Sequence, residues 1–505
     1  MAVMDVILHY SFQHPLLFAL VTFVCAIVVA SNVSRPKQTE RVLIDVPFNE
    51  PNWQDCLRWS FDTANLIQDA YTKFHGKIFQ VWTSEGWEVI IPKHLIKELK
   101  SLPDNVLSAS ASMKEKFQAQ YTTLPVEGHE HGIAFIKSKL TKNLGKYVPS
   151  AMEELDYVLQ QQFQSYATWT PIKVNPKLIQ IIASVSSRMI VGPELCRNKL
   201  WLSTIISYST DVFMGATILK SFPHLLRPIV QFFLPQIWRL HQHNRTTAKI
   251  VKQALSRKKY DGEVEDAIHA MTAMLPESQR KNYQFIGLGL LGIAAAALHT
   301  TSREVTQMIY NLATHPEYIT ILRQELMEVL GQKAENLSLE NINKLRKMDS
   351  FMKETIRMQG PLLVFHRKVL KPIVLSDGTY LPLNSWISVP HSSIAGDANN
   401  FSSPTTFDGL RFFKQRQASP TEANKHQFVS IDAKNMYFGA GKHACPGRFF
   451  AAMLIKMILA ELLMRFDFEL EDGEDRPEDW VFGGLKILKP YTEILIRDRV
   501  VVGDD

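Results

Sequence analysis

A single cysteine, Cys445, lies in a glycine-rich loop near the end of the chain, in the stretch FGAGKHACPGRFF. Gly439, Gly441 and Gly447 permit positive φ, so this loop is expected to lie flat against a large planar group. Pro446 suits the first position of a helix, because its missing N–H is not needed there. We therefore expect Cys445 at a helix amino terminus, where peptide dipoles and free N–H groups favour the thiolate.

A thiolate held by backbone N–H groups beside a flat surface is the arrangement of an axial ligand to haem iron. Two other interpretations compete with it. A buried structural cysteine has no need of three nearby glycines. A nucleophilic cysteine with His443 as its base also stays open, although no oxyanion or substrate motif accompanies it.

The same stretch matches a long haem-ligand signature, FxxGxxxCxG. The positions in register are Phe438, Gly441, Cys445 and Gly447. On this motif the chain resembles the cytochromes P-450, and the resemblance extends over nearly the whole sequence. It implies a mainly helical fold with small peripheral β-sheets, the cytochrome P-450 fold, around a bound haem b.

Two further matches occur in the family's order. The segment KETIR contains Glu354 and Arg357, which are one helical turn apart on the same face. FDGLRF contains Arg411, and the resemblance implies that it completes a buried ion network with that pair. A Glu-x-x-Arg pair alone is usually a surface salt bridge worth well under ~1 kcal/mol. Its place before the cysteine, with Arg411 between them, favours the buried network.

The family's oxygen-binding helix carries an AGx(D/E)T(T/S) segment, and this chain reads AALHTT. The resemblance places Thr300 beside the bound oxygen, followed by Thr301. Ala297 replaces the usual glycine and His299 replaces the acid that helps to route protons. A histidine can carry protons near neutral pH. The alternative for His299 is a helix histidine that only satisfies a backbone carbonyl.

Glycines and alanines are concentrated on the same predicted helix, from Gly287 to Ala297. Such small residues let another body approach the backbone closely. The apolar run from Phe285 to Leu298 is too short for a second membrane span.

Haem carboxylates need cationic partners, and the resemblance assigns this role to His443 and Arg367. The family's WxxxR feature is not legible, and His131 or Lys137 are weak substitutes. The residues expected to bind haem are Cys445, Phe438, Gly439, Gly441, His443, Gly447 and Arg367. The family's substrate positions correspond to Ala295, Ala296, Val364, Phe365, Gly483 and Gly484.

Two β-hairpins and several long helices are predicted around these residues. Residues 76–92 read as two strands around a Ser84-Glu85-Gly86 turn, and Asp377-Gly378 marks a second hairpin. Helical patterns dominate residues 104–281, and three long helices are expected over residues 282–314, 338–358 and 446–466. Breaks are expected at Pro125, Pro149, Pro171, Pro193, Pro223 and Pro228.

A strongly apolar segment, PLLFALVTFVCAIVVA, lies near the amino terminus from Pro15 to Ala30. Arg35 and Lys37 follow it and no lysine or arginine precedes it, so the positive-inside rule puts the bulk of the protein in the cytosol. A cleaved signal peptide is the alternative, because the run is slightly short for a span. We expect an uncleaved single-pass anchor over residues 1–31 in the endoplasmic reticulum membrane, a linker over 32–53 and one haem-binding catalytic domain over 54–505.

The composition is that of a large globular protein. Hydrophobic residues make up 46% and charged residues 21% of the 505 residues. The formal charge of +6 suits an acidic partner or an anionic membrane but is too diffuse to indicate nucleic-acid binding. The four cysteines, at positions 25, 56, 196 and 445, are far apart, which argues against a disulfide framework or a zinc site.

The resemblance implies a monooxygenase that oxidises a hydrophobic small molecule with O2 and electrons from NADPH. The implied partners are the NADPH-cytochrome P-450 reductase and cytochrome b5. The wording of the motifs is similar to fungal members that act on terpenoids or indole alkaloids. Two other classes stay open, namely a haem-thiolate isomerase or dehydratase that needs no external electrons, and a non-catalytic haem or ligand carrier.

Overall fold

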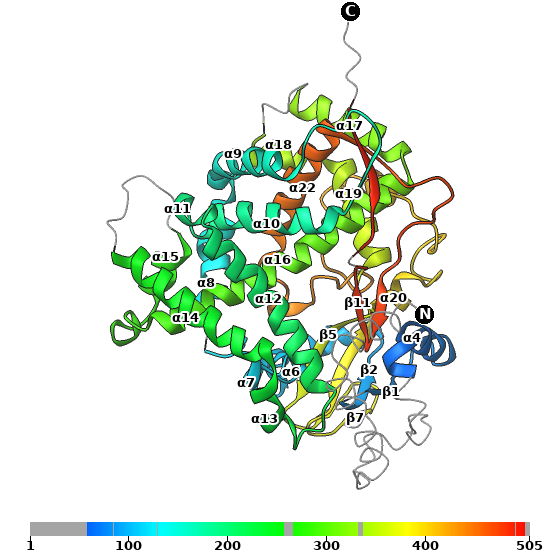
Figure 1. Ribbon diagram of the computed structural model, residues 1–505. Coiled ribbons are helices and arrows are strands. Elements are labelled where there is room, and N and C mark those ends of the chain that lie inside the picture. Colours follow the sequence, from blue (N-terminus) through cyan, green and yellow to red (C-terminus); the bar gives the residue numbers. More distant parts are fainter. Residues whose placement is uncertain are drawn as a thin grey trace, which may run out of the picture.

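The computed structural model describes residues 58–499, apart from residues 84, 129, 257–265, 332–336 and 490. The predicted anchor over residues 1–31 and the linker over 32–53 lie outside the described residues. Figure 1 shows that helices fill most of the molecule, while the largest sheet lies to one side with β1, β2 and β5. This arrangement confirms the predicted mainly helical fold with small sheets.

Long helices carry the core and short helices occupy the connections. Their bounds are α4 Thr63–Lys73, α5 Ile96–Leu99, α6 Ala109–Lys116, α7 Ala119–Thr122, α8 Glu130–Phe135, α9 Leu144–Gln162, α10 Val174–Ile190, α11 Pro193–Cys196, α12 Lys199–Lys220, α13 Arg227–Val230, α14 Pro235–Ser256, α15 Ala267–Met274, α16 Tyr283–Thr314, α17 Glu317–Leu330, α18 Leu339–Lys344, α19 Arg346–Gln359, α20 His391–Ala395, α21 Arg411–Gln417 and α22 Arg448–Arg465.

The strands form one five-stranded sheet and three smaller ones. Their bounds are β1 Phe79–Thr83, β2 Gly86–Ile90, β3 Leu107–Ser108, β4 Thr170–Ile172, β5 Leu363–Val369, β6 Ile373–Val374, β7 Tyr380–Leu381, β8 Trp386–Pro390, β9 Phe466–Glu469, β10 Trp480–Phe482, β11 Leu485–Ile487 and β12 Ile494–Asp498. The sheet orders are β1-β2-β8-β5-β3, β4-β12-β9, β6-β7 and β10-β11. Both predicted hairpins are confirmed, as β1-β2 and β6-β7.

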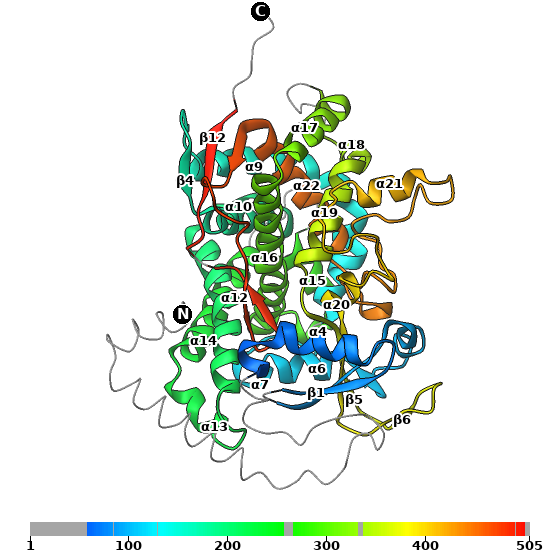
Figure 2. The ribbon, with the colours of Figure 1, turned by 90° about the vertical axis from the view of Figure 1, so that its right-hand side faces the viewer.

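Helix α16 is the axis of the helical part, and Figure 2 shows it running through the middle of the molecule. It packs against α10, α12, α14 and α19. Asn282 caps its amino end, with the side chain accepting a hydrogen bond from the N–H of Phe285. Among the described residues, α12 and α16 are long and apolar enough to cross a bilayer, but 50% and 56% of their apolar windows are buried inside the fold. Such burial is what core helices of a globular domain show.

Three predicted boundaries are wrong. Pro149 does not break the helical pattern but lies inside α9, in its second turn, where its missing N–H costs the helix one backbone hydrogen bond. The single helix predicted over residues 338–358 is two helices, because Leu345 leaves helical geometry with ψ of 77° between α18 and α19. The last long helix begins at Arg448, so Pro446 precedes it and does not occupy its first position.

Candidate active site

The cysteine loop is closed by its own backbone. The N–H of Cys445 donates to the carbonyl of Phe438 at 2.8 Å. Gly439 and Gly441 adopt φ of +77° and +67°, which confirms their predicted conformational role. A Cβ on Gly441 would lie 2.4 Å from the carbonyl oxygen of Lys100, so the loop also needs glycine there for close packing. Gly447 differs from the prediction, because its φ is −86° and it is the N-cap of α22.

Cys445 presents an exposed side chain in the part of the chain that the structure describes. Although the side chain is accessible, the protein atoms packed around it displace enough water to raise the pKa of the thiol, against the opposing effects of the Gly447 backbone N–H and the Arg448 charge. The backbone N–H groups at the start of the helix therefore favour the thiolate, as expected, but burial outweighs them in the protein by itself. A metal ion bound to the sulfur supplies the positive charge that such a site needs, since coordination deprotonates a thiol.

One face of α16 is exposed although the residues beside it on the helix are buried. Ala296 and Thr300 are exposed, although both lie in a helix whose adjacent residues Ala295 and Thr301 are only 6% and 4% exposed. Thr300 Oγ1 donates to the carbonyl of Ala296 at 2.7 Å. Because the two residues are four apart, they form one small face with a hydroxyl whose lone pairs stay available.

Other segments of the protein pack closely against the glycines of α16. A Cβ on Gly292 would lie 2.5 Å from Cγ of Pro125, and one on Gly287 would lie 3.2 Å from Thr247. The predicted close approach to the α16 backbone is therefore confirmed. The loop that carries Pro125 packs against Gly292, and α14 packs against Gly287. The alanine at position 296 contributes to the open face instead.

The predicted ion network is present and fully buried. Glu354 and Arg357 are 0% and 2% exposed, and Arg357 donates to both carboxylate oxygens of Glu354 at 2.8 Å. Arg411 joins them with Nε 3.1 Å from each oxygen. The other guanidinium nitrogens, Arg357 Nη1 and both Nη atoms of Arg411, donate to backbone carbonyls, those of Ala395, Ser402, Ser403, Pro404 and Thr406. A buried charge cluster with every polar atom paired fixes the relative positions of α19, α21 and the loop between α20 and α21.

His299 turns toward α12. Its Nε2 lies 3.2 Å from Oγ1 of Thr210, and the ring meets Phe213 edge-on at 6.4 Å between centroids. Burial lowers the pKa of His299, while a backbone hydrogen bond with Ile206 works in the opposite direction. These contacts favour a structural histidine over a proton carrier, and its role in a relay stays a prediction.

Arg367 is buried without an acidic partner in contact. It is 7% exposed, donates to the carbonyl of His366 at 2.8 Å and stacks over the ring of Phe365. Burial lowers the pKa of its guanidinium to about 10, although Asp104 partly opposes this. Phe365 adopts φ of +56° and β5 has a bulge between Val364 and Arg367. A bulge and a strained residue of this kind change the direction in which the next side chain points, here that of Arg367.

The other predicted cations have different surroundings. His443 Nε2 lies 2.5 Å from Oδ1 of Asp104. This ring nitrogen therefore already has a carboxylate partner within the protein. Burial acts to raise the pKa of Asp104, but the hydrogen bond and charge of His443 outweigh it and the pKa is lowered. His131 lies against Phe285 at the start of α16, whereas Lys137 lies beside the cysteine loop. Sequence reasoning missed Asp104, because nothing local links positions 104 and 443.

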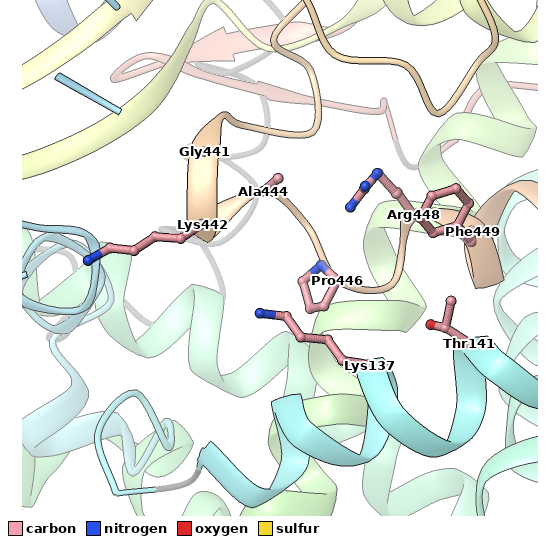
Figure 3. Close-up of a pocket in the computed structure, with 8 residues that line it drawn as sticks. All are labelled: Lys137, Thr141, Gly441, Lys442, Ala444, Pro446, Arg448 and Phe449. Carbon is pink, nitrogen blue, oxygen red and sulfur yellow. The ribbon is translucent and has the colours of Figure 1, made fainter. Parts of the chain in front are cut away.

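A basic pocket of about 330 Å³ lies under the cysteine loop. Figure 3 shows Lys137 and Thr141 reaching up from the helical segment after α8, opposite Pro446 and Arg448. The remaining lining residues are Gly441, Lys442, Ala444 and Phe449. Three cations and no acidic side chain line this pocket, so it suits an anionic group.

The predicted substrate positions are dispersed. Ala295, Val364 and Phe365 are buried among core residues. The turn at Gly483 and Gly484 packs on the start of the described chain, where a Cβ on Gly484 would lie 3.1 Å from the ring of Trp59. Of this set, Ala296 is the position on the open face of α16. Substrate contact at all six positions stays a prediction.

Comparison with known proteins identifies the class. The family profile of cytochrome P-450 matches residues 128–494. A cytochrome P-450 monooxygenase of Emericella nidulans is 33% identical over 463 residues, covering 90% of this chain and 86% of the relative. The cytochrome P-450 monooxygenase olcJ of Penicillium canescens is 32% identical over 491 residues, covering 95% and 92%. The ent-kaurene oxidase of Fusarium fujikuroi is 32% identical over 465 residues, covering 89% and 86%.

The chain belongs to the cytochrome P-450 family and is a monooxygenase of the fungal secondary-metabolite type. The family implies a haem, and the residues present fit one. Cys445 offers an accessible sulfur on a flat loop, and Ala296 with Thr300 offers an open face of small residues. Arg367 is a buried cation that lacks a contacting carboxylate among the described residues, which suits a haem propionate.

Proposed function

We propose that this protein hydroxylates or otherwise oxidises a hydrophobic small molecule, using O2 and electrons that a reductase takes from NADPH. The observation that carries the proposal is the open pair of Ala296 and Thr300 on α16, together with the accessible sulfur of Cys445. A carrier would need the sulfur but not the hydroxyl.

When bound, haem supplies oxygen activation and the transfer of an oxygen atom. Cys445 would hold the haem iron through its sulfur, whose electron density supports this oxygen chemistry. Thr300 holds a proton at Oγ1 and accepts another through its lone pairs. Arg367 would hold a haem propionate, and the buried Glu354 network keeps α19, α21 and the loop between α20 and α21 in place.

The substrate class that fits best is a terpenoid or an indole alkaloid of fungal secondary metabolism. Ala296 leaves an apolar surface beside Thr300, and a relative of similar length is named ent-kaurene oxidase. A rigid hydrocarbon skeleton gains binding energy from such a surface without polar partners.

The basic pocket under the cysteine loop is the proposed docking site for the acidic surface of the reductase or of cytochrome b5. Lys137→Glu combined with Lys442→Glu should slow reduction by the reductase at least tenfold, most strongly at low ionic strength. Turnover driven by an added peroxide bypasses the reductase and should be retained. Equal slowing of both reactions would mean that the variants damage the site itself.

The proposed location is the endoplasmic reticulum membrane, with the catalytic domain in the cytosol. Support comes from an exposed apolar patch between α12 and α14, in which Leu225, Phe232 and Phe233 are 89%, 65% and 76% exposed. Soluble surfaces rarely gather such side chains. A protein that lacks residues 1–31 should still bind phosphatidylcholine vesicles. Changing Leu225, Phe232 and Phe233 to serine should weaken that binding. Unchanged binding would remove the patch from the proposal.

The function is tested by product formation from candidate terpenoids with and without NADPH and reductase. The proposal predicts an oxygenated product that carries label from ¹⁸O2 and requires both components. Turnover that continues without them would instead identify an isomerase or dehydratase.

A further inference from the structure

A buried polar cluster lies immediately after the two threonines of α16. Arg303 donates to Glu304 and also to Asp479, which precedes β10, with Nη2 2.5 Å from Oδ2. Its Nη2 further donates to the carbonyl of Gln359 at 2.7 Å. The guanidinium therefore joins α16, the end of α19 and the C-terminal hairpin at one point.

Two carboxyls share this one guanidinium. Asp479 has a second donor, since Gln307 Nε2 donates to its Oδ1 at 2.7 Å. Glu304 is 3% exposed, and its Oε1 accepts from Arg303. Its Oε2 is buried, and besides Arg303 the group that interacts with this carboxyl by hydrogen bonding is the Tyr437 hydroxyl. When two acids compete for one cation, the less well-solvated acid is the one that keeps its proton.

Electrostatics agree with this geometry. Burial raises the pKa of the Glu304 carboxyl, and the charge of Asp479 raises it further, against the opposing effects of Arg303 and Tyr437. The titratable groups that affect this carboxyl or its partners are Arg303, Asp479, Tyr437, Arg476 and Lys486. Tyr437, which directly precedes Phe438 of the cysteine loop, lies close enough for its own pKa to be raised by Glu304 as well as by burial.

The carboxyl is also correctly placed along the helix. Glu304 follows Thr300 by four residues, a spacing that puts side chains on one face with Cβ atoms about 5–6 Å apart. Side chains on a helix tilt toward its amino end, which directs the carboxyl of Glu304 back over the turn of Thr300. Meanwhile His299, at the family's acid position, is engaged with Thr210 on α12.

We propose that Glu304 is the proton-donating residue behind Thr300, holding a proton at Oε2 and releasing it toward Thr300 Oγ1 while His299 serves structure. This inference rests on the proposed monooxygenase function, because only oxygen activation consumes such protons. In the step, the O–H bond at Oε2 breaks and a new O–H bond forms at Thr300 Oγ1, directly or through one water. Thr300 passes its own proton onward, the remaining carboxylate is paired with Arg303, and solvent restores the proton.

The first test asks whether Glu304 holds a proton, and it needs no turnover. Infrared spectra of the haem-bound protein are recorded in H2O and D2O for the wild type, Glu304→Gln and Asp479→Asn. The proposal predicts a deuterium-sensitive carboxylic-acid band in the wild type that Glu304→Gln removes. Asp479→Asn should remove it too, because Arg303 then serves Glu304 alone and ionises it. A wild-type spectrum that loses no such band in Glu304→Gln overturns the proposal.

The second test asks whether the proton is used. Glu304→Gln should divert electrons to hydrogen peroxide and lower product per NADPH roughly tenfold, with a larger solvent isotope effect. Glu304→Asp should restore part of the coupling, whereas a purely structural role would not distinguish Asp from Gln by isotope effect. Wild-type coupling in Glu304→Gln overturns the inference alone. Absence of NADPH-dependent product in the wild type would overturn the proposed function and leave the infrared result standing.

Discussion

Glu354 is the buried carboxylate that pairs with two buried guanidinium groups, those of Arg357 and Arg411. Glu354→Ala should therefore destabilise the fold by about 3–5 kcal/mol, because it leaves Arg357 and Arg411 buried and uncompensated. Urea unfolding of the haem-bound protein measures this. The matched control is Glu340→Ala, which removes an exposed i,i+4 pair with Lys344 and should leave the unfolding midpoint unchanged. Equal effects of the two variants would contradict a special role for the network.

Substitution of Arg367 tests most directly whether this side chain binds a haem propionate. Arg367→Gln should lower the haem content of purified protein several-fold, since the buried cation that neutralises a propionate is lost. The ratio of haem to protein absorbance measures it. Lys371→Gln, a nearby exposed cation, serves as the control and should retain full haem content. Full content in Arg367→Gln would show that the side chain faces no propionate.

His391 makes stability depend on pH. Burial lowers the pKa of this 1%-exposed imidazole to about 4, against an unfolded value of about 6.5. Between these values the unfolded chain binds a proton that the folded chain refuses, so stability falls as pH decreases from about 6.5 to about 4, by about 3 kcal/mol in total. His391→Gln should flatten this part of the stability profile, measured by denaturant unfolding. A profile with the same slope as wild type would assign the dependence to other groups.

At the scale of elements, α16 is positioned by glycine contacts as much as by its apolar residues. Gly292→Ala should destabilise by about 1–3 kcal/mol, because the added Cβ would lie 2.5 Å from the Pro125 ring. Gly145→Ala in α9 is the control, since its Cβ would meet only Leu339 at 3.7 Å and alanine favours helix. It should be neutral or slightly stabilising in the same denaturant measurement. A neutral Gly292→Ala would mean that the Pro125 loop moves away freely.

Local signals predict the elements well and their ends less well. The hairpin turns at Gly86 and Gly378 and the full length of α16 follow from turn residues and apolar pattern. The break at Leu345 has no such signal, because the residue is an ordinary helix former that tertiary packing moves out of helical geometry.

At the scale of the whole molecule, residues within one short motif could be predicted from the sequence, whereas contacts between distant segments could not. Short motifs of fixed spacing predict Cys445, Thr300 and the Glu354 network, because each motif carries its own geometry, and the structure confirms the network. The partners of His443 and Glu304 were missed, since Asp104 and Asp479 are distant in the chain and only the fold brings them close. The sole local sign was a charged pair, Arg303-Glu304, placed directly after the threonines of an apolar helix.

The proposed function depends on Cys445 binding haem iron through its sulfur. The most direct measurement is the absorption spectrum of the reduced, carbon-monoxide-bound protein, compared between wild type and Cys445→Ala at equal haem content. We predict the long-wavelength band of thiolate ligation in the wild type and its complete loss in the variant. An identical band in both proteins would show that Cys445 is not the ligand of the haem iron.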